Sequence, residues 1–278
     1  MNAKKSNQLV VAQMQMTSID DVEKNLQQIV ALVAQLKNQN VRLLSLPENA
    51  LYMRVKEGEA VKPLHLTDHV FVELAKLAIE NHFHIHVGAS PIEIEGHVYN
   101  SSVHITDLGE VKASYQKIHL FDIQLEGQAP VRESDAFKHG QKPSIFDIDG
   151  WKIGETICYD LRFAELFSIY AHQDVDLILV PAAFLVPTGK AHWEVLLRAR
   201  AIESQAYVVA TAQCGIHRGI RGGERSTFGH SLCVEPWGKI ENIMADEIGV
   251  AVVRLDAGRI GQVRTQIPMK HHRRLHKA

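Results

Sequence analysis

The segment Gly-Glu-Thr-Ile-Cys-Tyr-Asp-Leu-Arg at residues 154–162 marks the point where a predicted strand gives way to a predicted helix. Residues 151–157 have the apolar character of a buried strand, and residues 163–170 have the apolar spacing of a helix. Cys158 therefore falls on the turn between them, where backbone N–H groups and a helix N-terminus favour the thiolate form. The sequence makes Cys158 a candidate nucleophile, although a structural role is the more common fate of a buried free cysteine.

Outward from this segment, strands and helices alternate towards both ends of the chain, with consecutive strands in between. Strands are predicted at residues 9–12, 41–46, 84–88, 98–106, 111–116, 144–148, 175–180, 206–212, 228–234 and 249–255, and helices at 22–36, 68–79 and 192–205. Alternation indicates helices on the faces of a sheet, and consecutive strands indicate antiparallel pairs. Mixed sheets with outer helices satisfy both patterns. Residues 1–278 are expected to form a single domain, because no linker-like stretch interrupts them.

The composition argues against several classes of protein. Of the 278 residues, 46% are hydrophobic, which is enough for a core and argues against a disordered chain. The 30 basic and 32 acidic residues nearly balance, whereas proteins that bind nucleic acid or anionic membranes usually carry a basic excess. The three cysteines, Cys158, Cys214 and Cys233, do not suggest a secreted disulfide scaffold. With no apolar run of membrane-spanning length, these features predict a cytoplasmic protein.

Two further segments place ionisable residues at strand ends. Glu48, in Leu-Pro-Glu-Asn, follows the strand at 41–46, and Lys117 follows the strand at 111–116. A carboxylate that is partly buried there could act as a general base. Taken singly, each residue is more commonly a solvated surface charge.

Together the three segments resemble the nitrilase, or carbon–nitrogen hydrolase, superfamily. The matching motifs are Leu-Pro-Glu-Asn at Glu48, Tyr-Gln-Lys-Ile-His-Leu-Phe-Asp at Lys117 and Cys-Tyr-Asp-Leu-Arg-Phe at Cys158, in the order of the family. The similarity extends from the first strand to about Val263. It implies an α/β fold, a four-layer α-β-β-α sandwich, and a homodimer that buries the helix at about 163–172.

The resemblance also implies the chemistry, which is hydrolysis of a small-molecule amide. Cys158 would attack the amide carbon, and Glu48 would move the protons. Lys117 and the backbone N–H of Tyr159 would hold the oxyanion. Glu133 matches the second carboxylate expected in the family, which would keep Lys117 charged and positioned. No metal and no cofactor are implied.

The substrate is less closely defined by the resemblance. Residues 188–203 resemble the branch that acts on α-keto acid ω-amides. Within it, residues 212–218 and 229–231 resemble members that hydrolyse deaminated glutathione to 2-oxoglutarate and cysteinylglycine, a metabolite-repair reaction. Two alternatives stay open. One is an ω-amidase that acts on α-ketoglutaramate, and the other is a catalytically idle binding or scaffold protein on the same fold.

A keto acid amide carries a carboxylate, so its site needs a cation beyond Lys117. Arg162, four residues after Cys158, is the candidate. Its expected helpers in substrate binding are Tyr159, Phe184, Thr188 and His192. The alternative is that Arg162 only braces the turn by pairing with Asp160 or Glu165.

Two further stretches, one rich in histidine and one basic, do not support a function of their own. His82, His84 and His86 alternate, and on a strand they would share one face and could bind zinc. No accompanying metal-ligand motif supports that hypothesis. The basic run at residues 270–277 could touch nucleic acid, but a solvated tail is the more common role of such a run.

Overall fold

The computed structural model describes residues 5–56, 58–124 and 131–274. Its helices are α1 (Val22–Val33), α2 (His69–Asn81), α3 (Ala164–His172), α4 (Val186–Ser204), α5 (Ala257–Gln266) and α6 (Met269–His272), with the short 3₁₀ helices η1 (Ala34–Leu36), η2 (Glu133–Asp135) and η3 (Cys158–Arg162). Its strands are β1 (Gln8–Gln15), β2 (Leu43–Ser45), β3 (His84–Ile94), β4 (His97–Ile105), β5 (Val111–Gln116), β6 (Asp122–Ile123), β7 (Val131–Arg132), β8 (Ile145–Ile148), β9 (Trp151–Glu155), β10 (Leu177–Leu179), β11 (Tyr207–Ala210), β12 (Cys214–Arg218), β13 (Glu224–Phe228), β14 (Leu232–Val234), β15 (Ile240–Ile243) and β16 (Gly249–Asp256).

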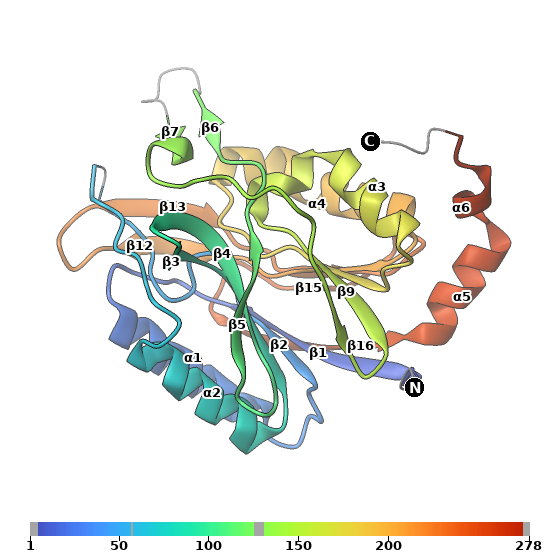
Figure 1. The fold of residues 1–278 in the computed structure, drawn as a ribbon, viewed down its shortest axis with the longest axis horizontal. Coiled ribbons are helices and arrows are strands. Elements are labelled where there is room, and N and C mark those ends of the chain that lie inside the picture. The colour runs from blue at the N-terminus through green and yellow to red at the C-terminus, as the bar shows by residue number, and fades with distance from the viewer. Residues whose placement is uncertain (1–4, 57, 125–130, 275–278) are drawn as a thin grey trace.

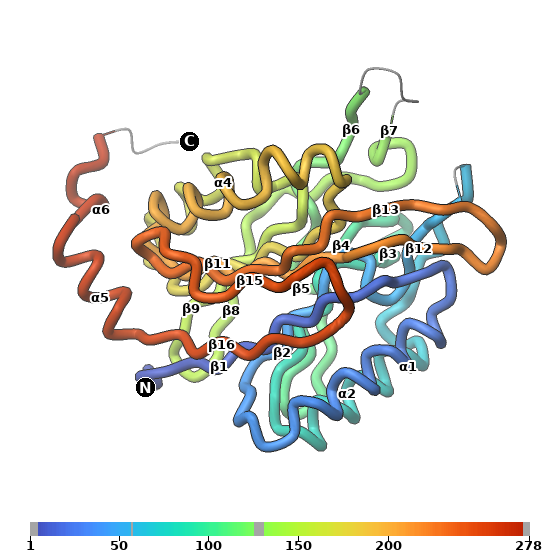
Figure 2. The backbone as a smooth tube through the Cα atoms, turned by 180° about the vertical axis from the view of Figure 1, so that it is seen from behind, coloured from blue at the N-terminus to red at the C-terminus, as the bar shows by residue number. Residues whose placement is uncertain are grey.

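Two six-stranded sheets form the inner layers, and helices form the outer ones (Figures 1 and 2). The first sheet has the order β16-β1-β2-β3-β4-β5, and the second has the order β15-β14-β11-β10-β9-β8. A core cluster joins the sheets through residues such as Val11 and Leu43 of the first and Ile153 and Leu179 of the second. A second cluster packs α1 and α2 against the first sheet, and a third packs α3 and α4 against the second sheet. The expected four-layer α-β-β-α sandwich is confirmed.

Strand direction decides which chain segments meet at one edge of a sheet. β1, β2 and β3 run parallel, and α1 and α2 provide the crossovers that parallel strands require. β4 is antiparallel to β3, and β5 is antiparallel to β4, so β5 runs in the direction of β2. In the second sheet β9, β10 and β11 are parallel. The segments that follow β2 and β5 therefore emerge at the same edge of the first sheet.

The clearest differences between the predicted elements and the structure concern α4 and the β12–β13 hairpin. The helix expected at 192–205 begins at Val186, because Pro187 is accepted in a first helical turn although it would break a helix interior. The strand expected at 228–234 covers only β14, since Gly229 and His230 have left-handed backbone angles that interrupt it. The residues before this break pair instead with β12 as a separate hairpin, β12–β13, which is not among the predicted elements.

The C-terminal part of the chain forms two further helices. The polar helix α5 is not among the predicted elements, and with α6 it runs along the side of the layers (Figure 2). Of the basic run at 270–277, residues 275–277 lie outside the described residues. Among the helices described, none combines the length and the apolar character that crossing a membrane requires. Residues 1–278 as a single domain remain a prediction.

The β12–β13 hairpin is anchored by the fully buried His217. Its Nδ1 lies 2.6 Å from the Ser18 carbonyl oxygen, and its Nε2 lies 2.8 Å from the Thr227 hydroxyl oxygen. Because a carbonyl only accepts, Nδ1 carries the proton, and Nε2 can accept from Thr227 when the ring is neutral. Burial lowers the pKa of His217 to about 4, which keeps the ring neutral in the folded protein.

Stability is therefore expected to fall as the pH drops from about 6.5 towards 4. An unfolded histidine takes up its proton near pH 6.5, whereas folded His217 resists protonation until about pH 4, so protons favour the unfolded chain in this window. The measurement is the urea midpoint at pH 7.5 and pH 5.0. The drop should be smaller in His217→Gln than in the wild type, and the exposed His65→Gln should keep the wild-type drop. Equal drops in all three proteins would contradict the expectation.

Candidate active site

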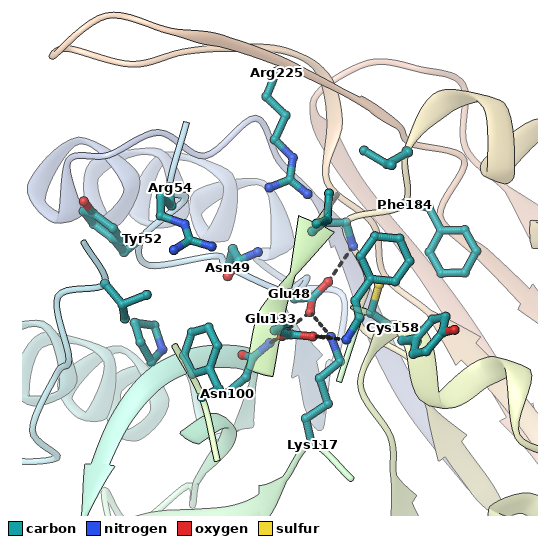
Figure 3. A pocket seen from close by; sticks show the side chains of 18 of the residues that line it. Glu48, Asn49, Tyr52, Arg54, Asn100, Lys117, Glu133, Cys158, Phe184 and Arg225 are labelled. Atoms are coloured by element: carbon teal, nitrogen blue, oxygen red, sulfur yellow. Dashed lines mark hydrogen bonds and ion pairs between the residues drawn. The ribbon is translucent and has the colours of Figure 1, made fainter. Parts of the chain in front are cut away.

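The three residues that carry the resemblance meet in one pocket, although they come from two sheets (Figure 3). Glu48 lies three residues beyond the end of β2, and Lys117 directly follows β5, at the same edge of the first sheet. Cys158 lies three residues beyond β9 of the second sheet, at the start of η3. All three line the pocket and are almost completely buried.

Glu48 is held by backbone contacts from both sheets. Its segment pairs with Ala89 of β3 in a parallel bridge, and its Oε2 accepts a hydrogen bond of 3.0 Å from the Ala183 N–H, beyond the end of β10. Gly88 makes this convergence possible. A Cβ there would lie 2.2 Å from the Leu46 carbonyl oxygen and 2.3 Å from the Pro181 Cβ. The carboxylate is therefore fixed at a place where segments of the two sheets approach each other closely.

Lys117 lies between two carboxylates. Its Nζ is 3.0 Å from Glu48 Oε1 and 2.8 Å from Glu133 Oε2 (Figure 3). Burial disfavours the ammonium, but the negative charges of Glu133 and Glu48 outweigh it, so the pKa of Lys117 is raised above its ordinary value. Lys117 therefore stays a cation at physiological pH.

Glu133 reaches the site from η2 and is fixed at both oxygens. The Phe121 N–H donates to its Oε2 at 2.6 Å, and the Asn100 side-chain amide donates to its Oε1 at 2.9 Å. The same amide donates to Glu48 Oε1 at 3.1 Å. Asn100, on β4, thus ties the two carboxylates together, and no motif identified it beforehand.

Cys158 has an unusual backbone conformation, with φ of 47°. This left-handed region is uncommon for residues other than glycine and is typical of functional turns. The backbone N–H of Cys158 donates to the Pro181 carbonyl at 2.8 Å, which links the turn to the end of β10.

The expectation that the turn favours a thiolate is wrong for Cys158 in the unliganded protein. Burial, followed by the negative charge of Glu48, raises the pKa of the Cys158 thiol well above its usual value, and the opposing effect of Lys117 does not cancel this. Cys158 is therefore a neutral thiol at rest. It needs a base to become a nucleophile, and the Glu48 carboxylate interacts with it directly.

The expected substrate-binding residues are mostly, but not all, at the pocket. Tyr159, Arg162, Phe184 and Thr188 line it, whereas His192 is absent from its lining. Instead, Arg162 Nη1 donates to His192 Nδ1 at 3.0 Å, because a guanidinium can only donate. The Arg162 guanidinium also lies 5.3 Å from the centre of the Phe184 ring and 5.6 Å from that of Tyr159. These contacts position the guanidinium at the pocket wall.

Arg162 does not brace the turn through the carboxylates that the alternative required. Asp160 is fully buried and accepts hydrogen bonds from the Tyr115 hydroxyl and from the Ile157 and His119 N–H groups. Among the ion pairs of the described residues, none joins Arg162 to Asp160 or Glu165. Neither of these carboxylates therefore neutralises the charge of Arg162.

The zinc hypothesis for the alternating histidines finds no support in their placement. His82 is not on a strand but ends α2 in a left-handed conformation, so it does not share a face with the other two. His84 Nδ1 lies 3.0 Å from His104 Nε2, and His86 Nε2 lies 3.1 Å from Glu155 Oε1. In the described part of the chain, no three His, Cys, Asp or Glu side chains are grouped so that they could hold a metal ion.

Known proteins resemble this chain over nearly its full length. A family model of carbon-nitrogen hydrolases matches residues 10–265. Deaminated glutathione amidase of Yersinia enterocolitica is 36% identical over 269 residues, covering 95% of this chain and 92% of that protein. The Homo sapiens protein of the same name is 35% identical over 275 residues, covering 95% of this chain and 82% of that protein. The crystal structure of the C. elegans NitFhit protein superposes with a TM-score of 0.83 at 30% identity, covering 98% of this chain and 66% of that chain. On this likeness, the chain belongs to the carbon-nitrogen hydrolase family.

Proposed function

We propose that this carbon-nitrogen hydrolase cleaves the amide bond of deaminated glutathione and releases 2-oxoglutarate and cysteinylglycine. The observation that carries the proposal is the Lys117 ammonium, held at 3.0 Å from Glu48 and 2.8 Å from Glu133 in the pocket that Cys158 lines. Relatives in bacteria and eukaryotes that match this chain are named deaminated glutathione amidases, which supports this choice of substrate.

In the first half of the reaction, Glu48 takes the proton of the Cys158 thiol, and the sulfur attacks the amide carbon. The negative charge that forms on the amide oxygen is stabilised by the Lys117 ammonium and the Tyr159 backbone N–H. Glu48 then gives its proton to the amide nitrogen, the C–N bond breaks, and cysteinylglycine leaves. The acyl group remains on Cys158 as a thioester.

In the second half, Glu48 takes a proton from a water molecule, which attacks the thioester carbon. The C–S bond breaks, 2-oxoglutarate is released, and the proton held by Glu48 returns to the sulfur. Glu133 and Asn100 do not exchange protons in this scheme. They are positioning residues, because they hold Lys117 and Glu48 by the hydrogen bonds described above.

The α-keto acid end of the substrate is assigned to Arg162. Arg162→Met is expected to raise KM about tenfold or more for both deaminated glutathione and α-ketoglutaramate, because both carry the same α-keto carboxylate and a charge-assisted hydrogen bond is lost. The kcat should change much less. An unchanged KM for both substrates would remove Arg162 from the substrate site.

The substrate itself is tested by following 2-oxoglutarate with a coupled dehydrogenase, with ammonium in excess so that released ammonia does not bias the assay. Wild-type protein should turn over deaminated glutathione faster than α-ketoglutaramate. The opposite preference would keep the mechanism and make the protein an ω-amidase. Turnover of neither substrate would favour an idle scaffold.

A homodimer that buries α3 and a cytoplasmic location are further parts of the proposal. The free thiols of Cys158, Cys214 and Cys233 are consistent with a reducing compartment. Sedimentation of the purified protein would test the dimer.

A further inference from the structure

The pocket contains positive charge that the proposed mechanism does not use. Arg54 and Arg225 both line it. Arg54 follows Glu48 by six residues, and Arg225 lies on β13. Figure 3 shows the Arg54 guanidinium next to Asn49, on the other side of Glu48 from Phe184 in that view, and the Arg225 guanidinium pointing down towards the pocket from above Glu48.

Neither arginine is neutralised by a carboxylate that the structure describes. In the described ranges, no ion pair includes Arg54 or Arg225. Arg54 Nη1 donates to the backbone carbonyl of Glu59 at 3.3 Å, and the Glu59 carboxylate is occupied by Arg221 and the Tyr52 hydroxyl. Two cations are thus left facing one pocket, and such a pair attracts an anion.

The fold holds the two arginine-bearing segments together. Gly223, in the turn of the β12–β13 hairpin, packs so closely that a Cβ there would lie 2.9 Å from the Lys56 Cα. Arg225 pairs across the hairpin with His217, whose buried ring anchors the hairpin to Ser18. The two guanidinium groups are therefore carried on backbone that is fixed before a ligand binds, which reduces the entropy lost on binding.

The mechanism indicates which part of a substrate lies near these arginines. Glu48 protonates the leaving nitrogen, so the leaving group must lie on the Glu48 side of the pocket. Arg54 and Asn49 belong to the segment that continues from Glu48, whereas Arg162 belongs to the segment that continues from Cys158. Arg162 accordingly suits the acyl part of the substrate, and the Arg54 side suits the leaving group.

We propose that Arg54 and Arg225 form an anion subsite for the carboxylate of the leaving group, so that the pocket selects amides that carry a carboxylate on each side of the scissile bond. This inference rests on the proposed function. In deaminated glutathione the leaving-group carboxylate is that of the terminal glycine. α-Ketoglutaramate, which releases ammonia, has no such group.

The test compares deaminated glutathione, its analogue with a carboxamide in place of the glycine carboxylate, and α-ketoglutaramate. In Arg225→Gln and Arg54→Gln, KM for deaminated glutathione should rise about tenfold or more. The ratio of kcat/KM for deaminated glutathione to that for α-ketoglutaramate should fall by a similar factor. The carboxamide analogue should be a poor substrate for the wild type. Each of the two substitutions should lower kcat/KM for this analogue less than about threefold, because the analogue lacks the carboxylate that the arginines would bind. Arg218→Gln is the matched control, because Arg218 lies on the same hairpin, pairs with Glu224 and is not in the pocket lining.

Two outcomes would overturn the subsite. One is an equal loss for the acid and its carboxamide analogue, and the other is an equal rise in KM for α-ketoglutaramate. Calorimetric titration of deaminated glutathione into Cys158→Ala, with and without Arg225→Gln, separates this failure from failure of the proposed function. If Arg225→Gln does not weaken the binding of deaminated glutathione, the subsite proposal is rejected and the proposed function stands. If Cys158→Ala does not bind deaminated glutathione and the wild type does not turn it over, the subsite and the proposed function are both rejected.

Discussion

The Cys158→Ala variant is expected to hydrolyse deaminated glutathione about 10⁴-fold more slowly than the wild type, or not measurably. The substitution removes the sulfur that would form the thioester, and Glu48 and Lys117 cannot replace it. Alanine has the same Cβ as cysteine, so the positive φ of residue 158 adds no new backbone strain. The folded structure should survive, and the coupled 2-oxoglutarate assay measures the loss.

Cys214→Ala is the matched control. Cys214 is buried like Cys158, and burial raises the pKa of its thiol to about 11, yet it lies on β12 and is not in the pocket lining. Its substitution should leave turnover close to that of the wild type. Cys158→Ala activity above roughly a hundredth of the wild-type rate would contradict the assignment of Cys158 as the nucleophile.

The proposed catalytic residues are identified from the resemblance of their three motifs to a known family, and the direction of the strands explains how they meet. Glu48 and Lys117 come after β2 and β5, and the direction of these strands brings them to one edge. The thiolate expectation for Cys158 was wrong because it rested on the local turn alone. Burial and the charge of a residue distant in the sequence decide the protonation of the thiol. The Glu48 carboxylate, brought close by the other sheet, opposes a second negative charge.

Other parts of the site depend on tertiary packing and carry no local signal. Asn100 lies within β4 with nothing in its flanking residues to distinguish it from other polar strand residues. The Ala183 N–H that binds Glu48 is a backbone group, which any residue except proline would supply. Arg54 and Arg225 are far apart in the sequence and meet only because the unpredicted hairpin β12–β13 packs on the segment after Glu48.

Lys117→Met is expected to weaken catalysis and folding together. Loss of one oxyanion donor typically costs about 10²- to 10³-fold in rate, and here Glu48 would also lose the cation beside it. The free energy of unfolding should fall by about 3–5 kcal/mol, because the buried Glu48 carboxylate and the largely buried Glu133 carboxylate would keep their other hydrogen bonds but lose the cation between them. Steady-state kinetics and urea unfolding at pH 7.5 measure the two effects on the same protein.

The double variant Lys117→Met/Glu133→Gln separates these effects. Removing the charge of Glu133 leaves Glu48 as the only one of the two carboxylates that still lacks its cation, and the glutamine keeps the size of Glu133 and can still accept a hydrogen bond from the Phe121 N–H. Stability should therefore recover in part, whereas activity should not, because the ammonium at the oxyanion is still missing. Recovery of both would mean that Lys117 acts only by holding the fold together. Recovery of stability alone requires that the charge of Lys117 is used in the reaction itself.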